Sequence, residues 1–193
     1  MQNADEQMLV KSASGGNAAA FEELMRKHEG RMYAVALRMC GNREDAQDCL
    51  QEAMLRVYRA IQGFKGQSSF ATWVHRITMN TCLDELRRRK VRAASSLDSM
   101  LDSGWAPTDE DDTPERHSIA AEQRRTMEKA IASLPEDMRS AIVLRDVQGF
   151  SYDEIATILN ANVGTIKSRI SRGREKLREI LMRQPELFGR YPV

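Results

Sequence analysis

The sequence predicts an all-α protein of two small helical domains joined by a flexible acidic linker, and three observations lead to this prediction. Apolar residues recur three or four positions apart through long stretches without proline, which is the spacing of helices with one buried face. Capping residues and glycines divide these stretches into separate helices. Residues 93–117 break the pattern with a segment rich in Ser, Asp and Pro. We therefore expect an N-terminal domain over residues 1–92, a linker over 93–117 and a C-terminal domain over 118–193.

The composition excludes several classes of protein. No apolar run approaches the roughly 18 residues of a membrane span, and the N-terminus lacks the cationic start and apolar stretch of a signal peptide. Cys40, Cys49 and Cys82 are an odd, widely spaced set without a CxxC pair, which argues against a disulfide scaffold and a cysteine-rich zinc site. The histidines are isolated from one another: His28, His75 and His117. We expect a cytoplasmic protein without a cofactor or a metal and without membrane insertion.

The net charge of +1 conceals segments of strong and opposite charge. Residues 61–92 carry 7 basic and 2 acidic groups, a net of +5, and residues 163–183 carry the same numbers. Residues 93–115 carry 7 acidic groups and no basic one. Two nucleic-acid contacts joined by a linker that nucleic acid repels would give this pattern. By charge alone, chance clustering on solvated helix faces explains it equally well.

The N-terminal domain is predicted to hold a helix that ends before Gly41 and another that begins after the capping residue Asn42. One apolar stripe follows the first helix: Phe21, Leu24, Met25, His28, Met32, Val35, Ala36 and Met39. The second helix places its apolar residues on one face: Leu50, Met54, Val57, Tyr58 and Ile61. The other face is mainly acidic and holds Asp45, Asp48, Glu52, Leu55 and Arg59. Such a face is usually only solvated, so it does not by itself indicate a binding site.

A loop over residues 63–69, with two glycines, precedes a helix predicted from Phe70 to about Lys90. Its buried stripe is expected to hold Phe70, Val74, Ile77 and Thr81. A neighbouring face carries Trp73, Arg76, Asn80 and Arg87, and basic residues continue to Lys90. An exposed aromatic ring beside cations is typical of a surface for single-stranded nucleic acid. A core tryptophan with a solvated basic helix end is an equally good interpretation.

The C-terminal domain has the start and stop signals of consecutive short helices. Ser151 and Glu154 form a predicted capping box. Further helix boundaries are indicated at Pro135, Gly149, Asn160 and Asn162. The last helix is expected to bury Val163, Ile166, Ile170, Gly173, Leu177 and Ile180. A short capped helix, a tight turn and a second helix predict a helix-turn-helix, whose second helix enters the major groove of DNA.

The face of this last helix opposite its apolar stripe suits DNA. That face presents Thr165, Ser168, Ser171, Arg172 and Glu175, with Lys167, Arg169, Arg174 and Lys176 beside it. Hydrogen-bonding groups between cations are what base recognition together with phosphate anchoring requires. The alternative is an αα-hairpin with a basic solvated face. The caps, the apolar spacing and the charge together favour DNA binding.

These residues resemble the bacterial sigma factors of the extracytoplasmic-function (ECF, group IV) class of the sigma-70 family. The resemblance rests on Asp45 to Ala53 with Tyr58 to Ile61, on Phe64 to Gly66 with Ser69 to Ile77 and Asn80, and on Leu134 to Glu136 with Gly149 to Ala156 and Val163 to Arg169. These segments look like regions 2.2, 2.3 with 2.4, and 4 of the family, in the correct order around a variable acidic linker. No counterpart of the family's region 3 lies between them.

The resemblance implies a binding role for each surface. The acidic face (Asp45, Asp48, Gln51, Glu52 and Leu55) would bind the clamp helices of the RNA polymerase β′ subunit. The −10 promoter element would be held by Phe64, Lys65, Gly66, Ser69, Thr72, Trp73, Arg76, Asn80, Arg87 and Arg88. The −35 element would be read by Thr165, Lys167, Ser168, Arg169, Ser171, Arg172 and Arg174. No catalytic residue is implied, because preferential binding of the melted strand suffices to open the duplex.

The resemblance also implies partners. They are core RNA polymerase, including its β flap, promoter DNA, and an anti-sigma factor that masks both domains and that would in some cases hold the chain at the membrane. The linker would run through the RNA-exit path, and the free chain would be a monomer.

Three alternatives compete with the sigma interpretation. A helix-turn-helix regulator that acts without polymerase accounts for residues 134–182 but leaves the Trp73 face and the acidic face without a role. A small enzyme lacks support, because the sequence shows no nucleophile–base pair, metal cluster or glycine-rich phosphate loop. An anti-sigma or adaptor protein would not need the recognition helix.

Overall fold

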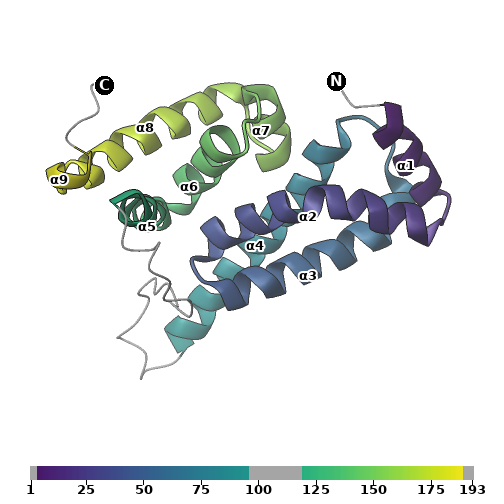
Figure 1. Ribbon diagram of the computed structural model, residues 1–193, viewed down its shortest axis with the longest axis horizontal. Helices are drawn as coiled ribbons and strands as arrows, with labels where there is room; N and C mark the ends of the chain where they lie inside the picture. The colour runs from purple at the N-terminus through teal and green to yellow at the C-terminus, as the bar shows by residue number, and fades with distance from the viewer. Residues whose placement is uncertain (1–3, 96–118, 189–193) are drawn as a thin grey trace.

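The computed structural model describes residues 4–95 and 119–188, and these residues form helices and short turns without any strand (Figure 1). The N-terminal domain consists of α1 (Ala4–Ser14), α2 (Ala18–Cys40), α3 (Arg43–Ala60), the 3-10 turn η1 (Ile61–Gly63) and α4 (Phe70–Ser95). The C-terminal domain consists of α5 (Ile119–Ala132), α6 (Glu136–Ile142), the π-helical turn η3 (Val143–Val147), α7 (Tyr152–Leu159), α8 (Val163–Leu181) and α9 (Pro185–Phe188). The predicted fold class is confirmed.

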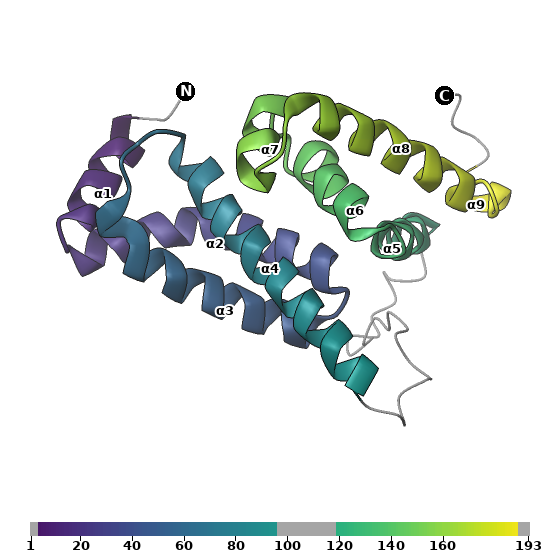
Figure 2. The same cartoon turned by 180° about the vertical axis from the view of Figure 1, so that it is seen from behind.

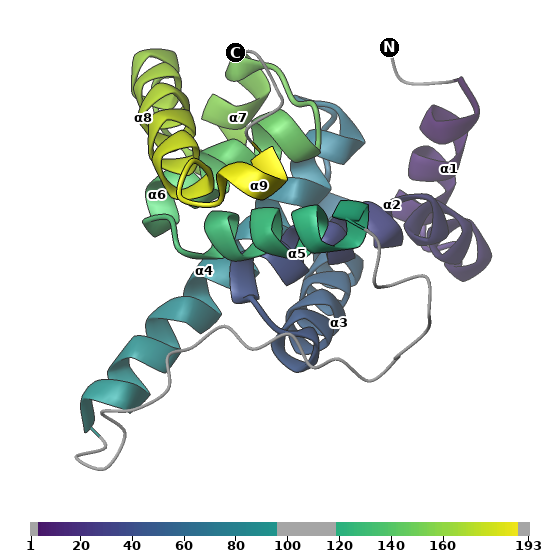
Figure 3. The ribbon, with the colours of Figure 1, turned by 60° about the vertical axis from the view of Figure 1, so that its left-hand side comes forward.

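Helices α2, α3 and α4 form the body of the N-terminal domain, with α1 packed at one end of α2 (Figure 2). The boundary between α2 and α3 is the predicted one, because Gly41 ends α2 with a φ of 82° and the Asn42 side chain accepts a hydrogen bond from the Asp45 backbone amide. Ser69 caps α4, since its hydroxyl accepts a 3.0 Å hydrogen bond from the Thr72 amide. Helix α4 continues to Ser95, beyond the expected end of the domain at residue 92. Its C-terminal end projects from the rest of the molecule (Figure 3).

The C-terminal domain contains the predicted helix-turn-helix, α7 and α8. The Ser151 and Glu154 side chains and backbone amides cap each other at the start of α7, as the capping box requires. Asn160 takes up the left-handed conformation, with a φ of 47°, and ends α7. The Asn162 side chain then accepts a 2.8 Å hydrogen bond from the Thr165 amide and begins α8. The capping residues read from the sequence thus define this motif.

Gly173 allows α8 to cross closely over α6. A Cβ atom at position 173 would lie 2.8 Å from Cγ1 of Ile142, nearer than side chains pack without displacing one another. Ile166 and Ile170 are buried on the same side of α8. The opposite side of the recognition helix therefore faces solvent.

The two domains pack against each other in this structure. Helix α7 lies beside α4, and α5 and α6 contact α2 (Figure 2). The ring of Phe150 packs 4.9 Å from the ring of His75, which is fully buried. Arg31 donates a 2.8 Å hydrogen bond to the Gln148 carbonyl, and Arg139 donates one of the same length to the Met39 carbonyl. Apolar side chains of both domains belong to one continuous core.

Most of the predicted linker, including its acidic run, lies outside the described residues. Within the described ranges, no helix is both long enough and apolar enough to cross a membrane.

Candidate nucleic-acid and polymerase interfaces

The outward face of α8 presents the side chains that were predicted to read duplex DNA. Lys167, Ser171, Arg172 and Arg174 are exposed, and Thr165, Ser168 and Arg169 are partly exposed. The Arg172 guanidinium donates a 3.1 Å hydrogen bond to the Ser168 hydroxyl, which orients it along the helix. Hydrogen-bonding groups and cations are therefore displayed together on one surface, as DNA recognition requires.

The cations of α8 differ in how they are held. Two nitrogens of the Arg174 guanidinium donate hydrogen bonds to the two carboxylate oxygens of Asp146, and the bond from Nε is 3.1 Å long. This interaction raises the pKa of Arg174. Arg169 lies 3.5 Å from a carboxylate oxygen of Asp137. Lys167 lies above the Tyr152 ring, 5.8 Å from its centre. Of the four cations predicted to contact the −35 element, Lys167 and Arg172 have no carboxylate partner within the described part of the chain, so they are the more available to phosphates and bases.

The surface predicted to bind the −10 element is less open than expected. The sequence left two interpretations of Trp73 open, an exposed ring and a core residue, and the core residue is the observed one, because the side chain is only 9% exposed. Its ring packs against Phe64 at 5.0 Å and Phe70 at 5.7 Å, so burial of the aromatic cluster outweighs exposure of one ring. Lys65, Gly66, Arg76 and Asn80 are exposed, and Phe64 and Ser69 are partly exposed. The loop before α4 and the exposed face of α4 thus remain a polar, basic surface.

A cavity lies between this loop and the C-terminal domain. Its walls include Phe64, Lys65, Ser68, Trp73 and Arg76, and Thr157 of α7 closes one side. Thr72, which the resemblance also assigns to the −10 surface, is buried in this packing, and its hydroxyl donates a 3.4 Å hydrogen bond to Glu154 of α7. The packing of α7 on α4 causes this burial, and a single sequence does not show that contact.

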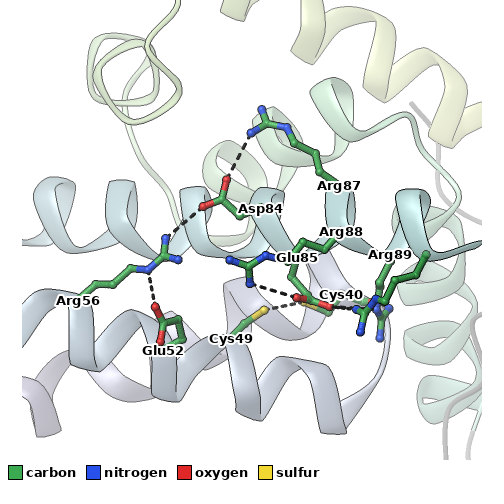
Figure 4. A network of polar contacts seen from close by, with 10 residues as sticks. Cys40, Cys49, Glu52, Arg56, Asp84, Glu85, Arg87, Arg88 and Arg89 are labelled. Atoms are coloured by element: carbon green, nitrogen blue, oxygen red, sulfur yellow. Dashed lines mark hydrogen bonds and ion pairs between the residues drawn. The ribbon is translucent and has the colours of Figure 1, made fainter.

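The basic end of α4 is open. Arg87 has 71% of its side chain exposed and forms a 3.4 Å ion pair with Asp84, and Arg88 forms a 3.6 Å ion pair with Glu85 (Figure 4). Exposed ion pairs of this kind are weak, so both guanidinium groups can release their carboxylate partners and bind a phosphate instead.

The acidic face of α3 divides into paired and open groups. Arg56 donates a 2.8 Å hydrogen bond to Glu52 and thereby lowers the pKa of that carboxyl group (Figure 4). Asp45 forms an ion pair with Arg89 of α4. Asp48, Gln51 and Leu55 are exposed, and Leu55 is an apolar side chain with half of its surface in contact with solvent. An apolar residue between open polar groups is typical of the centre of a protein interface.

Tyr58 also lies on the open side of α3, whereas its position in the apolar stripe predicted burial. The side chain is 57% exposed, and the edge of its ring packs on Phe21 at 5.1 Å. The predicted stripe is therefore correct at Val57 and Ile61 and wrong at Tyr58.

The fold also brings together side chains that the sequence spacing kept apart. The three cysteines, expected to share no site, converge between α2, α3 and α4, and their sulfur atoms all lie within 4.8 Å of one another. No sequence signal predicted this convergence, because each cysteine comes from a different helix.

Two helical domains, one of which presents a helix-turn-helix recognition helix and the other a basic helix end beside an acidic face, define a two-site DNA-binding protein. Comparison with known families assigns both domains. The model of Sigma-70 region 2 matches residues 24–92, and that of Sigma-70, region 4 matches residues 124–177. The chain belongs to the sigma-70 family of RNA polymerase sigma factors, in its ECF group.

Individual relatives agree with this assignment. The ECF RNA polymerase sigma factor SigE of Mycolicibacterium smegmatis is 40% identical over 89% of this chain and 66% of its own length. The RNA polymerase sigma-H factor of Pseudomonas aeruginosa is 36% identical over 91% of this chain and 93% of its own. The sigma factor RpoE of Bartonella quintana, solved in complex with the anti-sigma factor NepR, has a TM-score of 0.69 at 26% identity, over 84% of this chain and 96% of that one.

Proposed function

We propose that this chain binds core RNA polymerase and directs transcription from specific promoters. The observation that carries the proposal is that both family regions are present in order and that each presents its own basic surface. A regulator that acts without polymerase would need only the helix-turn-helix. The acidic face of α3, with exposed Asp48, Gln51 and Leu55, is the proposed contact with the β′ clamp helices.

In this proposal the α8 face reads the −35 element as duplex DNA. Lys167, Ser171 and Arg172 would reach base edges and phosphates, while Arg169 and Arg174, held by acidic neighbours, would contribute mainly to positioning. The proposal is supported by the exposure of these groups and by the burial of the opposite stripe of the helix.

The loop from Phe64 to Ser69 and the exposed groups of α4 would hold the separated strand of the −10 element. The cavity beside Phe64 and Trp73 has aromatic walls and a cationic rim from Lys65 and Arg76, which suits an unstacked base. Duplex opening would follow from stronger binding of the melted strand and would use no catalytic residue.

The observed packing restricts this second surface. Thr157 borders the cavity, and Glu154 holds Thr72, so a strand bound there would meet α7. In this proposal α7 moves away from α4 when the chain binds polymerase and DNA. An anti-sigma factor would control activity by binding preferentially to one of the two arrangements, with the domains packed together or separated. The similar RpoE protein was solved in complex with an anti-sigma factor. The site of action would be the cytoplasm, where bacterial transcription takes place.

Transcription in a purified system tests the proposal. Fragmented genomic DNA of the host is transcribed by core polymerase with and without the chain, and the transcripts are sequenced. We expect new transcripts that start at a small set of positions sharing two spaced sequence elements. If the chain adds no defined start sites although it binds duplex DNA, the proposal is wrong and the polymerase-independent regulator is favoured.

A further inference from the structure

Three thiols meet in the core of the N-terminal domain, each from a different helix. Cys40 is the last residue of α2, Cys49 lies in α3 and Cys82 lies in α4. They are 8%, 3% and 0% exposed, and their sulfurs lie within 4.8 Å of one another. These are the only cysteines in the sequence. All thiols of the chain are thus gathered at one point, a position that the DNA and polymerase surfaces do not use.

The spacing of the sulfurs fits a three-coordinate metal site. Metal–thiolate bonds of about 2.3 Å place the sulfurs of a planar trigonal site about 4.0 Å apart, which is the bond length times the square root of three. In the structure the Cys40 and Cys49 sulfurs lie 3.5 Å apart, and no pair exceeds 4.8 Å. Small shifts of side chains, without movement of the helices, would bring all three sulfurs to bonding distance of one ion.

Positive charges lie near this point. The guanidinium groups of Arg56 and Arg88 act electrostatically on Cys49, and that of Arg89 acts on Cys40. The Cys40 thiol donates a 3.5 Å hydrogen bond to the Cys49 sulfur. A cation bound by three thiolates would displace the thiol protons, which leave to solvent.

We propose that Cys40, Cys49 and Cys82 form a binding site for a soft, thiophilic metal ion, with Cu(I) as the ion that fits best. Thiolate sulfur is the ligand that soft ions prefer, whereas structural zinc takes four ligands. Among the described residues, no fourth cysteine, histidine or carboxylate joins the group. Three thiolates around one monovalent ion carry a net charge of −2. The guanidinium groups of Arg56, Arg88 and Arg89 act electrostatically on the cysteines, and each is also paired with a carboxylate.

In this proposal the ion enters at the end of α2. Cys40 is the most exposed of the three cysteines, and the next residue, Gly41, ends the helix in a left-handed turn. Opening of this turn would expose the Cys40 sulfur without separating α3 from α4. A bound ion would then join α2, α3 and α4, so its binding free energy adds to the stability of the domain.

The test uses the full chain, reduced and free of oxygen, titrated with Cu(I) as its acetonitrile complex in the presence of the competing chelator bicinchoninate. We expect one ion per chain, a thiolate-to-copper absorption band, protection of three thiols from Ellman's reagent and a higher melting temperature. Replacing Cys82 with Ala should weaken binding by more than the roughly 10–100-fold that loss of an outer-shell partner costs. Met39→Leu, which removes the buried sulfur of the residue next to Cys40 in the sequence and leaves all three thiols in place, is the matched control and should bind as the parent does.

Several results would overturn the proposal. One is equally tight binding of Cu(I) by the parent and by the Cys82→Ala chain. Another is a loss of helical circular dichroism when the ion is added. Tighter binding of Zn²⁺ than of Cu(I) would also count against a three-coordinate soft site. Should Cys82→Ala fail to fold, Cys40→Ala at the helix end supplies the same comparison, with folding checked by its urea midpoint.

Discussion

The two domains use their surfaces differently. In the C-terminal domain, the proposed DNA-binding side of α8 is separate from the buried stripe formed by Ile166 and Ile170. In the N-terminal domain, Thr72 and Trp73 are proposed contacts of the −10 element and are also buried. A binding face on one amphipathic helix can be read from helical periodicity, whereas a face built from a loop, a helix and a neighbouring domain depends on tertiary contacts.

The largest effect is expected from reversing a charge on the acidic face of α3. Because that face is acidic, its partner surface on polymerase is expected to be basic, and like charges across an interface cost several kcal/mol. Asp48→Arg should therefore weaken association with core polymerase by about 100-fold or more, measured by fluorescence anisotropy of the labelled chain. Glu29→Arg makes the same charge change at an exposed position of α2 and should bind normally. Equal binding by both variants would contradict the placement of the polymerase contact on α3.

The separate DNA face of α8 predicts a loss of binding without a loss of stability. Arg172→Ala should weaken binding to a −35 duplex by about 10–100-fold, the usual value of one base-reading arginine. The urea midpoint should stay within experimental error of the parent value, because the hydrogen bonds of Arg172 among the described residues go to Ser168 of its own helix. Arg178→Ala, at an exposed position near the other end of α8, is the control. A parallel fall in stability would show that the face is not independent of the core.

Acid should act on the contact between the domains through His75. Burial against Phe150 lowers the pKa of His75 to about 4, and its Nε2 has no hydrogen-bond partner among the described residues. In the unfolded chain His75 takes up a proton near pH 6.5. Its contribution to the free energy of unfolding is therefore fully present above that pH and is lost as the pH falls toward 4. At pH 5 the loss from this residue is about 2 kcal/mol.

Urea unfolding between pH 7.5 and 4.5 measures this effect, with His75→Phe as the comparison. The variant should retain a weaker dependence on pH, because burial also lowers the pKa of His28. An unchanged slope in the variant would mean that folding does not shift the pKa of His75.

Replacing a helical glycine with alanine should change the stability of the chain in opposite directions in the two domains. Gly173→Ala places a methyl group 2.8 Å from Ile142, so overpacking of about 1–3 kcal/mol exceeds the helix propensity gain of about 1 kcal/mol. Gly30→Ala in α2 meets no atom within 4 Å and should stabilise the chain by up to about 1 kcal/mol. Urea midpoints of both variants give the two signs directly, and stabilisation by Gly173→Ala would refute the close helix crossing.

Arg31 holds the packing of the two domains through contacts at the surface. Arg31→Glu removes two hydrogen bonds to Gln148 and the contact of the guanidinium with the Phe150 ring, a loss of about 1–2 kcal/mol at an exposed site. Small-angle scattering should show a larger radius of gyration for this variant, whereas Arg26→Glu, exposed elsewhere on α2, should scatter as the parent does. Identical curves for all three proteins would show that Arg31 does not hold the domains together.

The predictable parts of the structure are those set by local chemistry. Asn42, Ser151 with Glu154, Asn160 and Asn162 mark helix boundaries in the sequence because each satisfies backbone groups within a few residues. The burial of Trp73, the pairing of Asp45 with Arg89 and the meeting of the cysteines depend on residues that are distant in the chain. A single sequence carries no periodic signal for such contacts.

The separation of surfaces on α8 has a consequence for how promoter preference diverges among related chains. A substitution at Ser171 or Arg172 changes what the helix offers to DNA at a stability cost usually within about 0.5 kcal/mol, so such changes accumulate without compensating mutations. A change at Trp73 alters the aromatic core and the proposed strand-binding surface together, and most replacements there would be removed by selection on folding. If the proposed contacts hold, we expect the −35 preference to change between related chains more readily than the −10 preference, which depends on the packing that keeps the domain folded.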